Sequence, residues 1–163
     1  MTGRTAADLW PLAEAKLAAP RQPSGLVDRP RILQVLNAGA DTALTLVAAP
    51  PGFGKSTAVR AWCASRSEPL AWVTLDARDN DPVRLWTYIA TAVDRIRAGL
   101  GRTTLRRLGA AVEVSGPIDE LLNRIGGFAR ELLIVLDDLQ TVTDRDALAS
   151  IDYAVTHLPR THA

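Results

Sequence analysis

The chain has 163 residues, of which 47% are apolar and 23% are charged, and its formal net charge is +1 at pH 7. That length suits one domain with a proper core, and the near-neutral charge lacks the basic surplus of nucleic-acid-binding proteins. The single cysteine, Cys63, excludes a disulfide framework, and residues 1–17 carry too many charges for a signal peptide or a membrane span. We therefore expect a cytoplasmic protein without membrane contact.

The first predicted elements lead the chain into a strand. Residues 1–28 are rich in Ala and Pro, and we interpret them as an N-terminal arm rather than as part of the core. Asp28-Arg29-Pro30 predicts the start of a helix, because Asp caps free N–H groups and Pro suits the first turn. This helix should end at Gly39 and be followed by an apolar strand over residues 43–48.

A phosphate-binding pattern follows this strand. Residues 49–57 read Ala-Pro-Pro-Gly-Phe-Gly-Lys-Ser-Thr, with the glycine-rich loop and Lys-Ser of a Walker A loop, although Ala49 replaces the usual first glycine. Small residues let backbone N–H groups surround a di- or triphosphate. Lys55 would bring a positive charge to the β- and γ-phosphates, and Ser56 a hydroxyl ligand for Mg²⁺. The alternative is a Gly/Pro turn with a solvated Lys55.

The middle of the chain predicts several elements of a layered fold. A helix should run from the loop to about Ser65, and an apolar strand should cover residues 70–75. Asp81-Pro82 predicts the start of the next helix, which carries apolar residues at spacings of three and four. A short helix is expected between residues 102 and 114, and a longer one up to residue 128.

The second informative stretch is an apolar run that ends in two carboxylates. Residues 132–136 are Leu-Leu-Ile-Val-Leu, and Asp137 and Asp138 follow them. In a parallel sheet these acids would emerge at the same edge as the phosphate loop, as in a Walker B strand. Asp137 would then hold Mg²⁺ and Asp138 would orient an attacking water. The alternative is an ordinary turn after a strand. A last helix is expected over residues 144–158.

Five segments together resemble the nucleotide-binding domain of MalT-like, large ATP-binding LuxR-type transcriptional regulators, a branch of the STAND signalling ATPases. The segments are residues 26–31, 49–57, 71–76, 79–88 and 135–138. The phosphate loop by itself indicates only an NTPase. The Trp-rich run around Asp79-Asn80-Asp81-Pro82 is the part specific to the family.

The resemblance implies ATP or ADP as ligand, Mg²⁺ as cofactor, and a switch in which ATP and an inducer promote self-association. By matching positions, Thr57 would contact the α-phosphate, and the segment that contains Arg29 would lie near the adenine. The full set of expected nucleotide-binding residues is Arg29, Pro51, Gly52, Phe53, Gly54, Lys55, Ser56 and Thr57. Ser56 and Asp137 would hold the metal, and Asp138 would be catalytic.

Two departures from the family affect these expectations. Leu139-Gln140 stands where the family often has an aromatic residue and His, which puts a polar role there in doubt. The family also continues through a sensor strand, which in its sheet order lies between the P-loop strand and the Walker B strand. We therefore expect residues 29–163 to form the N-terminal part of an α/β, three-layer P-loop NTPase sandwich, related to AAA ATPases, with three strands of its parallel sheet present. Such a sheet would either close up or be completed by a partner chain.

Three functions stay open at this point. The leading one is an ATP/ADP-binding signalling module with slow or no hydrolysis, which leaves a weak ATPase activity open. The second is an interaction fragment that pairs with a full-length regulator and needs no nucleotide. The third is a small P-loop kinase, although only the loop around Arg106 offers the Arg-rich lid that a kinase usually has. No DNA contact is expected, because no helix has the basic face of a recognition helix.

Overall fold

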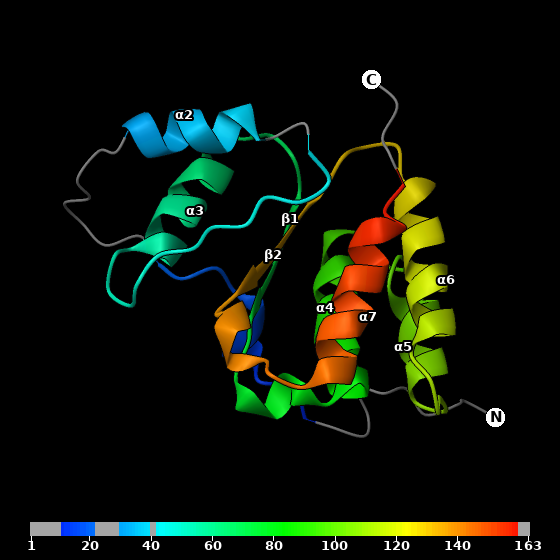
Figure 1. The fold of residues 1–163 in the computed structure, drawn as a ribbon. Helices are drawn as coiled ribbons and strands as arrows, with labels where there is room; N and C mark the ends of the chain where they lie inside the picture. The colour runs from blue at the N-terminus through cyan, green and yellow to red at the C-terminus, as the bar shows by residue number, and fades with distance from the viewer. Residues whose placement is uncertain (1–10, 22–29, 40–41, 160–163) are drawn as a thin grey trace.

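The computed structural model describes residues 11–21, 30–39 and 42–159. These residues form six α-helices, two β-strands and three short 3₁₀ turns (Figure 1). In chain order the elements are η1 (Glu14–Leu17), α2 (Pro30–Ala38), α3 (Lys55–Ala64), β1 (Leu70–Thr74), η2 (Ala77–Asn80), α4 (Pro82–Ile96), α5 (Arg102–Leu108), α6 (Ser115–Gly126), β2 (Leu133–Asp137), η3 (Leu139–Thr141) and α7 (Arg145–Thr156). The fold is α/β and compatible with a P-loop-like architecture.

The two strands form a parallel pair between two layers of helices. β1 and β2 pair in a register that sets Leu70 opposite Leu133 and Thr74 opposite Asp137. Helices α2 and α3 lie on one side of this pair, and α4 to α7 lie on the other (Figure 1). Both strands therefore end at the same edge, as expected for Asp137.

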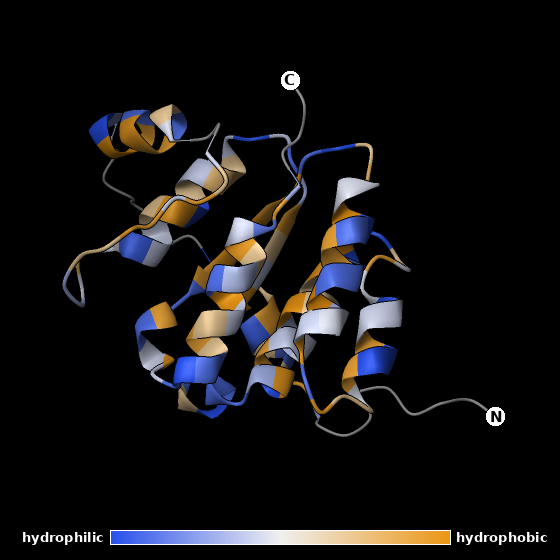
Figure 2. Cartoon of the chain, turned by 45° about the vertical axis from the view of Figure 1, so that its right-hand side comes forward, coloured by the Kyte–Doolittle hydropathy of each residue, from blue (hydrophilic) through white to orange (hydrophobic). Residues whose placement is uncertain are grey.

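The side chains of the strands alternate between two apolar clusters, because successive residues of a strand point to opposite faces. The larger cluster joins Ala71 and Val73 of β1 to buried residues of the helices α4 to α7. The smaller cluster lies under α2 and α3 and contains Leu36, Trp62 and Cys63. Figure 2 shows hydrophobic strands between helices whose outward faces are largely hydrophilic.

The prediction of a strand over residues 43–48 is wrong. Residues 42–50 form no ladder with any described part of the chain, so the sheet has two strands where we expected three. Leu44 and Leu46 are 58% and 74% exposed. A strand needs a neighbour that accepts and donates its backbone hydrogen bonds. Residues 42–50 have no such neighbour, and the sheet has not closed up around β2.

The helix predictions are largely confirmed. Asp81 caps α4 by accepting a hydrogen bond from the Arg84 N–H at 2.8 Å, and Pro82 stands in the first turn. The short helix expected after residue 102 is α5, and Asp144 caps α7. The expected cap at Asp28 lies outside the described residues.

The described part of the expected arm packs against the core. η1 lies beside β1, and Leu17 is buried within the larger apolar cluster. The division of the chain at residue 28 stays a prediction. Within the described segments, no helix is long and apolar enough to cross a membrane.

Candidate functional site

The loop before α3 has the backbone that a phosphate-binding loop needs. Gly52 and Gly54 adopt φ values of +82° and +74°, in the left-handed region that side chains disfavour. Gly54 is the N-cap of α3 and offers no side-chain acceptor to the helix. The first N–H groups of α3 therefore stay available at the positive end of the helix dipole, which is where anions bind.

Lys55 folds back across this loop. Its Nζ donates hydrogen bonds to the carbonyl oxygens of Ala49 at 2.7 Å and Pro50 at 3.4 Å. No carboxylate in the described part of the chain forms an ion pair with it. The ammonium charge is thus held at the loop by carbonyl groups and is not neutralised there.

Ser56 joins the loop to the end of β2. Its hydroxyl donates a hydrogen bond to Oδ1 of Asp137 at 2.8 Å, across 81 positions of sequence. Both residues are partly buried. A hydroxyl and a carboxylate are hard oxygen ligands, the type that Mg²⁺ prefers, and Mg²⁺ commonly uses few protein ligands together with substrate phosphates. This pair therefore fits a magnesium ion bound with a nucleotide. No group of three or more His, Cys, Asp or Glu that could hold a metal occurs within residues 11–21, 30–39 and 42–159.

Asp138 has an unusual backbone. Its φ is +58°, and it is the one residue other than glycine with a positive φ in the described ranges. A positive φ raises the conformational energy of a residue that has a side chain, and residues with such angles are often found at functional sites. The Gln140 side chain donates a hydrogen bond to Oδ1 of Asp138 at 2.8 Å. Gln140 is thus a polar partner of the candidate catalytic acid, although the departure from the family pattern at this position had put a polar role in doubt. The only signal in the sequence was its position two residues after Asp138.

The remaining expected site residues are placed as follows. Pro51 and Phe53 lie in the exposed loop, and Thr57 lies in the first turn of α3. Arg29 lies outside the described residues. The structure therefore brings residues 51–57 and the acids at the end of β2 to one edge of the sheet, and it says nothing of the expected adenine contact.

The acidic residues that follow β1 form ion pairs and hydrogen bonds with other parts of the protein. Asp79 is fully buried and forms ion pairs with Lys16 and with Arg84, the latter at 3.3 Å. It also accepts a hydrogen bond from the Asp76 N–H at 2.8 Å. Asn80 accepts hydrogen bonds from the N–H groups of residues 143 and 144. The segment specific to the family resemblance is therefore structural here, and sequence reasoning missed its partners.

Cys63 has no chemical role in this arrangement. It lies on α3, is buried in the smaller apolar cluster, and burial raises its pKa from 9.0 to about 11. The thiol therefore stays neutral at ordinary pH and packs as a small apolar side chain.

No family model matches the chain. The chain is similar to proteins named HTH-type transcriptional regulator MalT, over 150 residues in each case. It is 27% identical to the protein from Cronobacter sakazakii, 29% to that from Serratia proteamaculans and 28% to that from Yersinia enterocolitica. Each match covers 91% of this chain but only 16% of the relative. The similarity supports a relationship with MalT-type regulators, and the chain corresponds to a small part of their length.

Proposed function

We propose that this chain binds an adenine nucleotide together with Mg²⁺, as a signalling module of a MalT-type transcriptional regulator, with slow or no hydrolysis. The observation that carries the proposal is the hydrogen bond of 2.8 Å between Ser56 and Asp137. It joins a glycine-rich loop to the acidic end of a parallel strand, and these are the two parts that a nucleotide and its metal ion need.

Phosphate binding would depend on the loop and on the start of α3. The left-handed glycines turn the loop so that its N–H groups can surround an anion, and the helix dipole adds to the positive potential. The Lys55 ammonium is held by carbonyl groups at 2.7 and 3.4 Å, and a bound phosphate would offer it a stronger, charged acceptor.

Ser56 and Asp137 would hold the metal ion, which supplies positive charge against the phosphate oxygens when it is bound. Asp138 would orient a water molecule. One of its carboxylate oxygens already accepts a hydrogen bond from Gln140, which would help to orient the carboxylate.

The test is a titration of the chain with a fluorescent ATP analogue in the presence of Mg²⁺. We expect Lys55→Ala to weaken binding by more than about tenfold, since hydrogen bonds to charged groups contribute about 1.5–3 kcal/mol. Arg78→Ala is the matched control, because it also removes one positive charge but from a side chain that is 80% exposed and outside the loop. Equal affinity of the wild type and Lys55→Ala would reject the proposal.

A second function has one observation in its favour. Residues 42–50 stand outside the sheet and leave Leu44 and Leu46 largely exposed, as expected of a fragment that pairs with a full-length regulator. Co-purification of such a regulator that is insensitive to Lys55→Ala would favour this function over nucleotide binding. Nothing in the described structure favours the kinase.

A further inference from the structure

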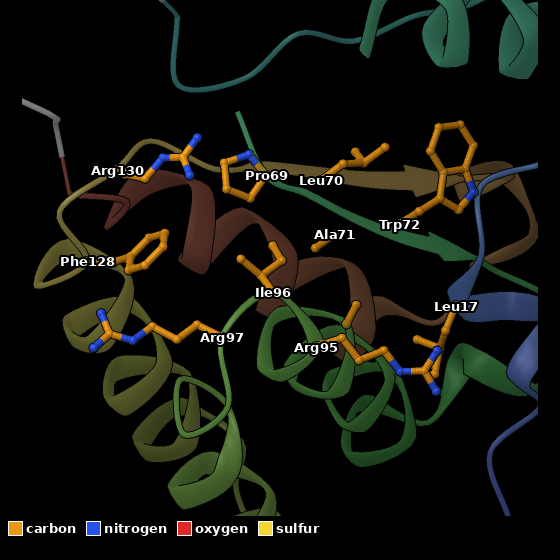
Figure 3. A pocket seen from close by; sticks show the side chains of 11 residues that line it. Leu17, Pro69, Leu70, Ala71, Trp72, Arg95, Ile96, Arg97, Phe128 and Arg130 are labelled. Atoms are coloured by element: carbon orange, nitrogen blue, oxygen red, sulfur yellow. The ribbon is translucent and has the colours of Figure 1, made fainter. Parts of the chain in front are cut away.

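A pocket of about 500 Å³ opens beside the start of β1 (Figure 3). In the part of the chain that the structure describes, β1 pairs with β2 on one side only, and the pocket is lined by the first residues of β1, the end of α4, the approach to β2 and Leu17 of η1. The candidate nucleotide site lies at the other end of the strands, beyond Thr74 and Asp137. The rise from Leu70 to Thr74 is about 13 Å, so the pocket is separate from that site.

Among the described residues, three guanidinium groups and no carboxylate line the pocket. Arg95, Arg97 and Arg130 all contribute to it, and Figure 3 shows Arg97 and Arg130 on either side of Phe128. Arg95 forms an ion pair with Glu14 at 2.5 Å. Both side chains are substantially exposed, so this pair contributes little to the stability of the fold. Arg97 and Arg130 form no ion pair with any residue that the structure describes. The pocket therefore carries a positive charge that is largely uncompensated.

The rest of the lining is mainly apolar. Leu17, Ile96 and Phe128 supply side chains to it, and the Arg97 guanidinium lies 5.9 Å from the centre of the Phe128 ring. Arg130 is directed by a hydrogen bond to the Ser67 carbonyl oxygen at 3.0 Å. A ligand would thus meet positive groups, one of them held by a hydrogen bond, around an apolar surface, and the volume suits a small molecule.

The backbone of β1 adds further donors. The Leu133 N–H donates to the Pro69 carbonyl, and the Leu75 N–H donates to the Asp137 carbonyl. The odd-numbered residues of β1 therefore pair with β2. In a parallel ladder the alternate residues, Leu70 and Trp72, direct their N–H and C=O groups to the opposite edge, which is the side of the pocket.

We propose that this pocket binds a small organic anion with a flat apolar body, such as an aromatic carboxylate, sulfonate or phosphate. The guanidinium fork matches the geometry of such anionic groups and also stacks on flat rings. The edge N–H groups of β1 can donate to the same ligand. The proposal is independent of nucleotide binding, because it uses none of the residues of the phosphate loop.

The test uses two fluorescent probes that share their aromatic body. The anion 8-anilinonaphthalene-1-sulfonate should bind the full chain more tightly than the neutral N-phenyl-1-naphthylamine, which lacks the sulfonate. The double substitution Arg97→Gln with Arg130→Gln should lower the affinity for the anionic probe by about tenfold or more. The double substitution Arg97→Lys with Arg130→Lys keeps both positive charges and should retain most of that affinity. The substitutions Arg78→Gln and Lys55→Ala lie outside the pocket and should leave the affinity for the anionic probe unchanged.

Hydrogen exchange on the wild-type chain locates the probe without relying on any variant. We expect the anionic probe to protect amides of residues 70–72 and 95–97. Protection confined to the exposed apolar residues 42–50 would overturn the proposal. So would equal affinity for the two probes, unchanged affinity after the paired substitutions to Gln, or no binding of the anionic probe. Saturating Mg²⁺ and ATP should not displace it, and displacement would also count against a separate site.

Discussion

The Ser56 hydroxyl and the Asp137 carboxylate depend on different parts of the chain for their positions. Ser56 is set by the left-handed glycine that precedes α3, and Asp137 by its place as the last residue of β2. The hydrogen bond between the two side chains shows that the end of β2 lies beside the start of α3. Neither residue could hold a metal ion with a nucleotide alone, so the pair is the unit to test.

Replacing Asp137 by Asn is the sharpest change at this scale. Asn keeps the size of the side chain and an oxygen that accepts from Ser56, but it removes the negative charge. We expect Asp137→Asn to reduce the affinity for Mg²⁺ by roughly tenfold or more. In titrations with a fluorescent ATP analogue, the gain in nucleotide affinity on adding Mg²⁺ should then disappear.

Asp138→Asn is the control for this experiment, since it makes the same chemical change one residue later. It should leave the effect of Mg²⁺ on nucleotide affinity intact, because Asp138 is turned toward Gln140. A chain that carries Asp137→Asn and still responds to Mg²⁺ like the wild type would show that the metal lies elsewhere.

At the scale of the elements, the sequence was a good guide wherever the signal was local. The helices carry apolar residues at spacings of three and four, and Asp81 and Asp144 cap two of them, so their existence and limits could be predicted. β1 and β2 could be predicted as continuous apolar runs, which is typical of strands covered on both faces. The glycine-rich loop that leads into α3 was likewise visible in the local sequence.

The failures share one physical cause. Residues 43–48 have the composition of a strand, but a strand exists only when another one pairs with it, and that depends on the whole sheet. Pairs such as Lys16 with Asp79, or Gln140 with Asp138, likewise depend on tertiary packing. The periodicity of the sequence does not predict which buried carboxylate forms an ion pair with which cation.

The cluster around Asp79 ties η1 to the core. Lys16 and Arg84 both form ion pairs with this carboxylate, which is fully buried. The Tyr88 hydroxyl accepts a hydrogen bond from the Ala13 N–H at 3.1 Å, and the Lys16 ammonium lies 4.4 Å from the centre of the Tyr88 ring. The N-terminal segment is thus held by charge as well as by the burial of Leu17.

We expect Asp79→Ala to lower the free energy of unfolding by about 3–5 kcal/mol, because it leaves two cations without their partner in a buried position. Asp81→Ala is the matched control. It removes an exposed carboxylate two residues away and should cost only the N-cap of α4, about 1 kcal/mol. Urea unfolding followed by circular dichroism measures both values.

Limited proteolysis separates this account from a general loss of packing. Cleavage between residues 11 and 21 should increase in Asp79→Ala before the rest of the chain is cut, and it should not increase in Asp81→Ala. Equal destabilisation by the two substitutions would mean that the ion pairs of Asp79 contribute little.

At the scale of the whole molecule, the sheet has an edge that the described residues leave open. The odd-numbered residues of β2 pair with β1, so Ile134 and Leu136 direct their backbone groups away from it. Nearby, Val47 packs in the smaller apolar cluster while Leu44 and Leu46 are largely exposed. Unpaired strand edges beside exposed apolar side chains favour association between chains.

We therefore expect the chain to associate as its concentration rises, and to do so through residues 42–50 and the open edge of β2. Burying one leucine side chain contributes about 1.5–3 kcal/mol, so Leu44→Lys with Leu46→Lys should weaken the association by more than about tenfold. Val112→Lys is the control, because Val112 is 99% exposed and lies between α5 and α6. Sedimentation velocity over a concentration series measures the effect. A wild-type chain that stays monomeric at all concentrations and unfolds in one sharp thermal transition would show that the open edge of β2 does not cause association. Equal effects of the leucine substitutions and of Val112→Lys would show that added charge alone, and not this surface, controls the association.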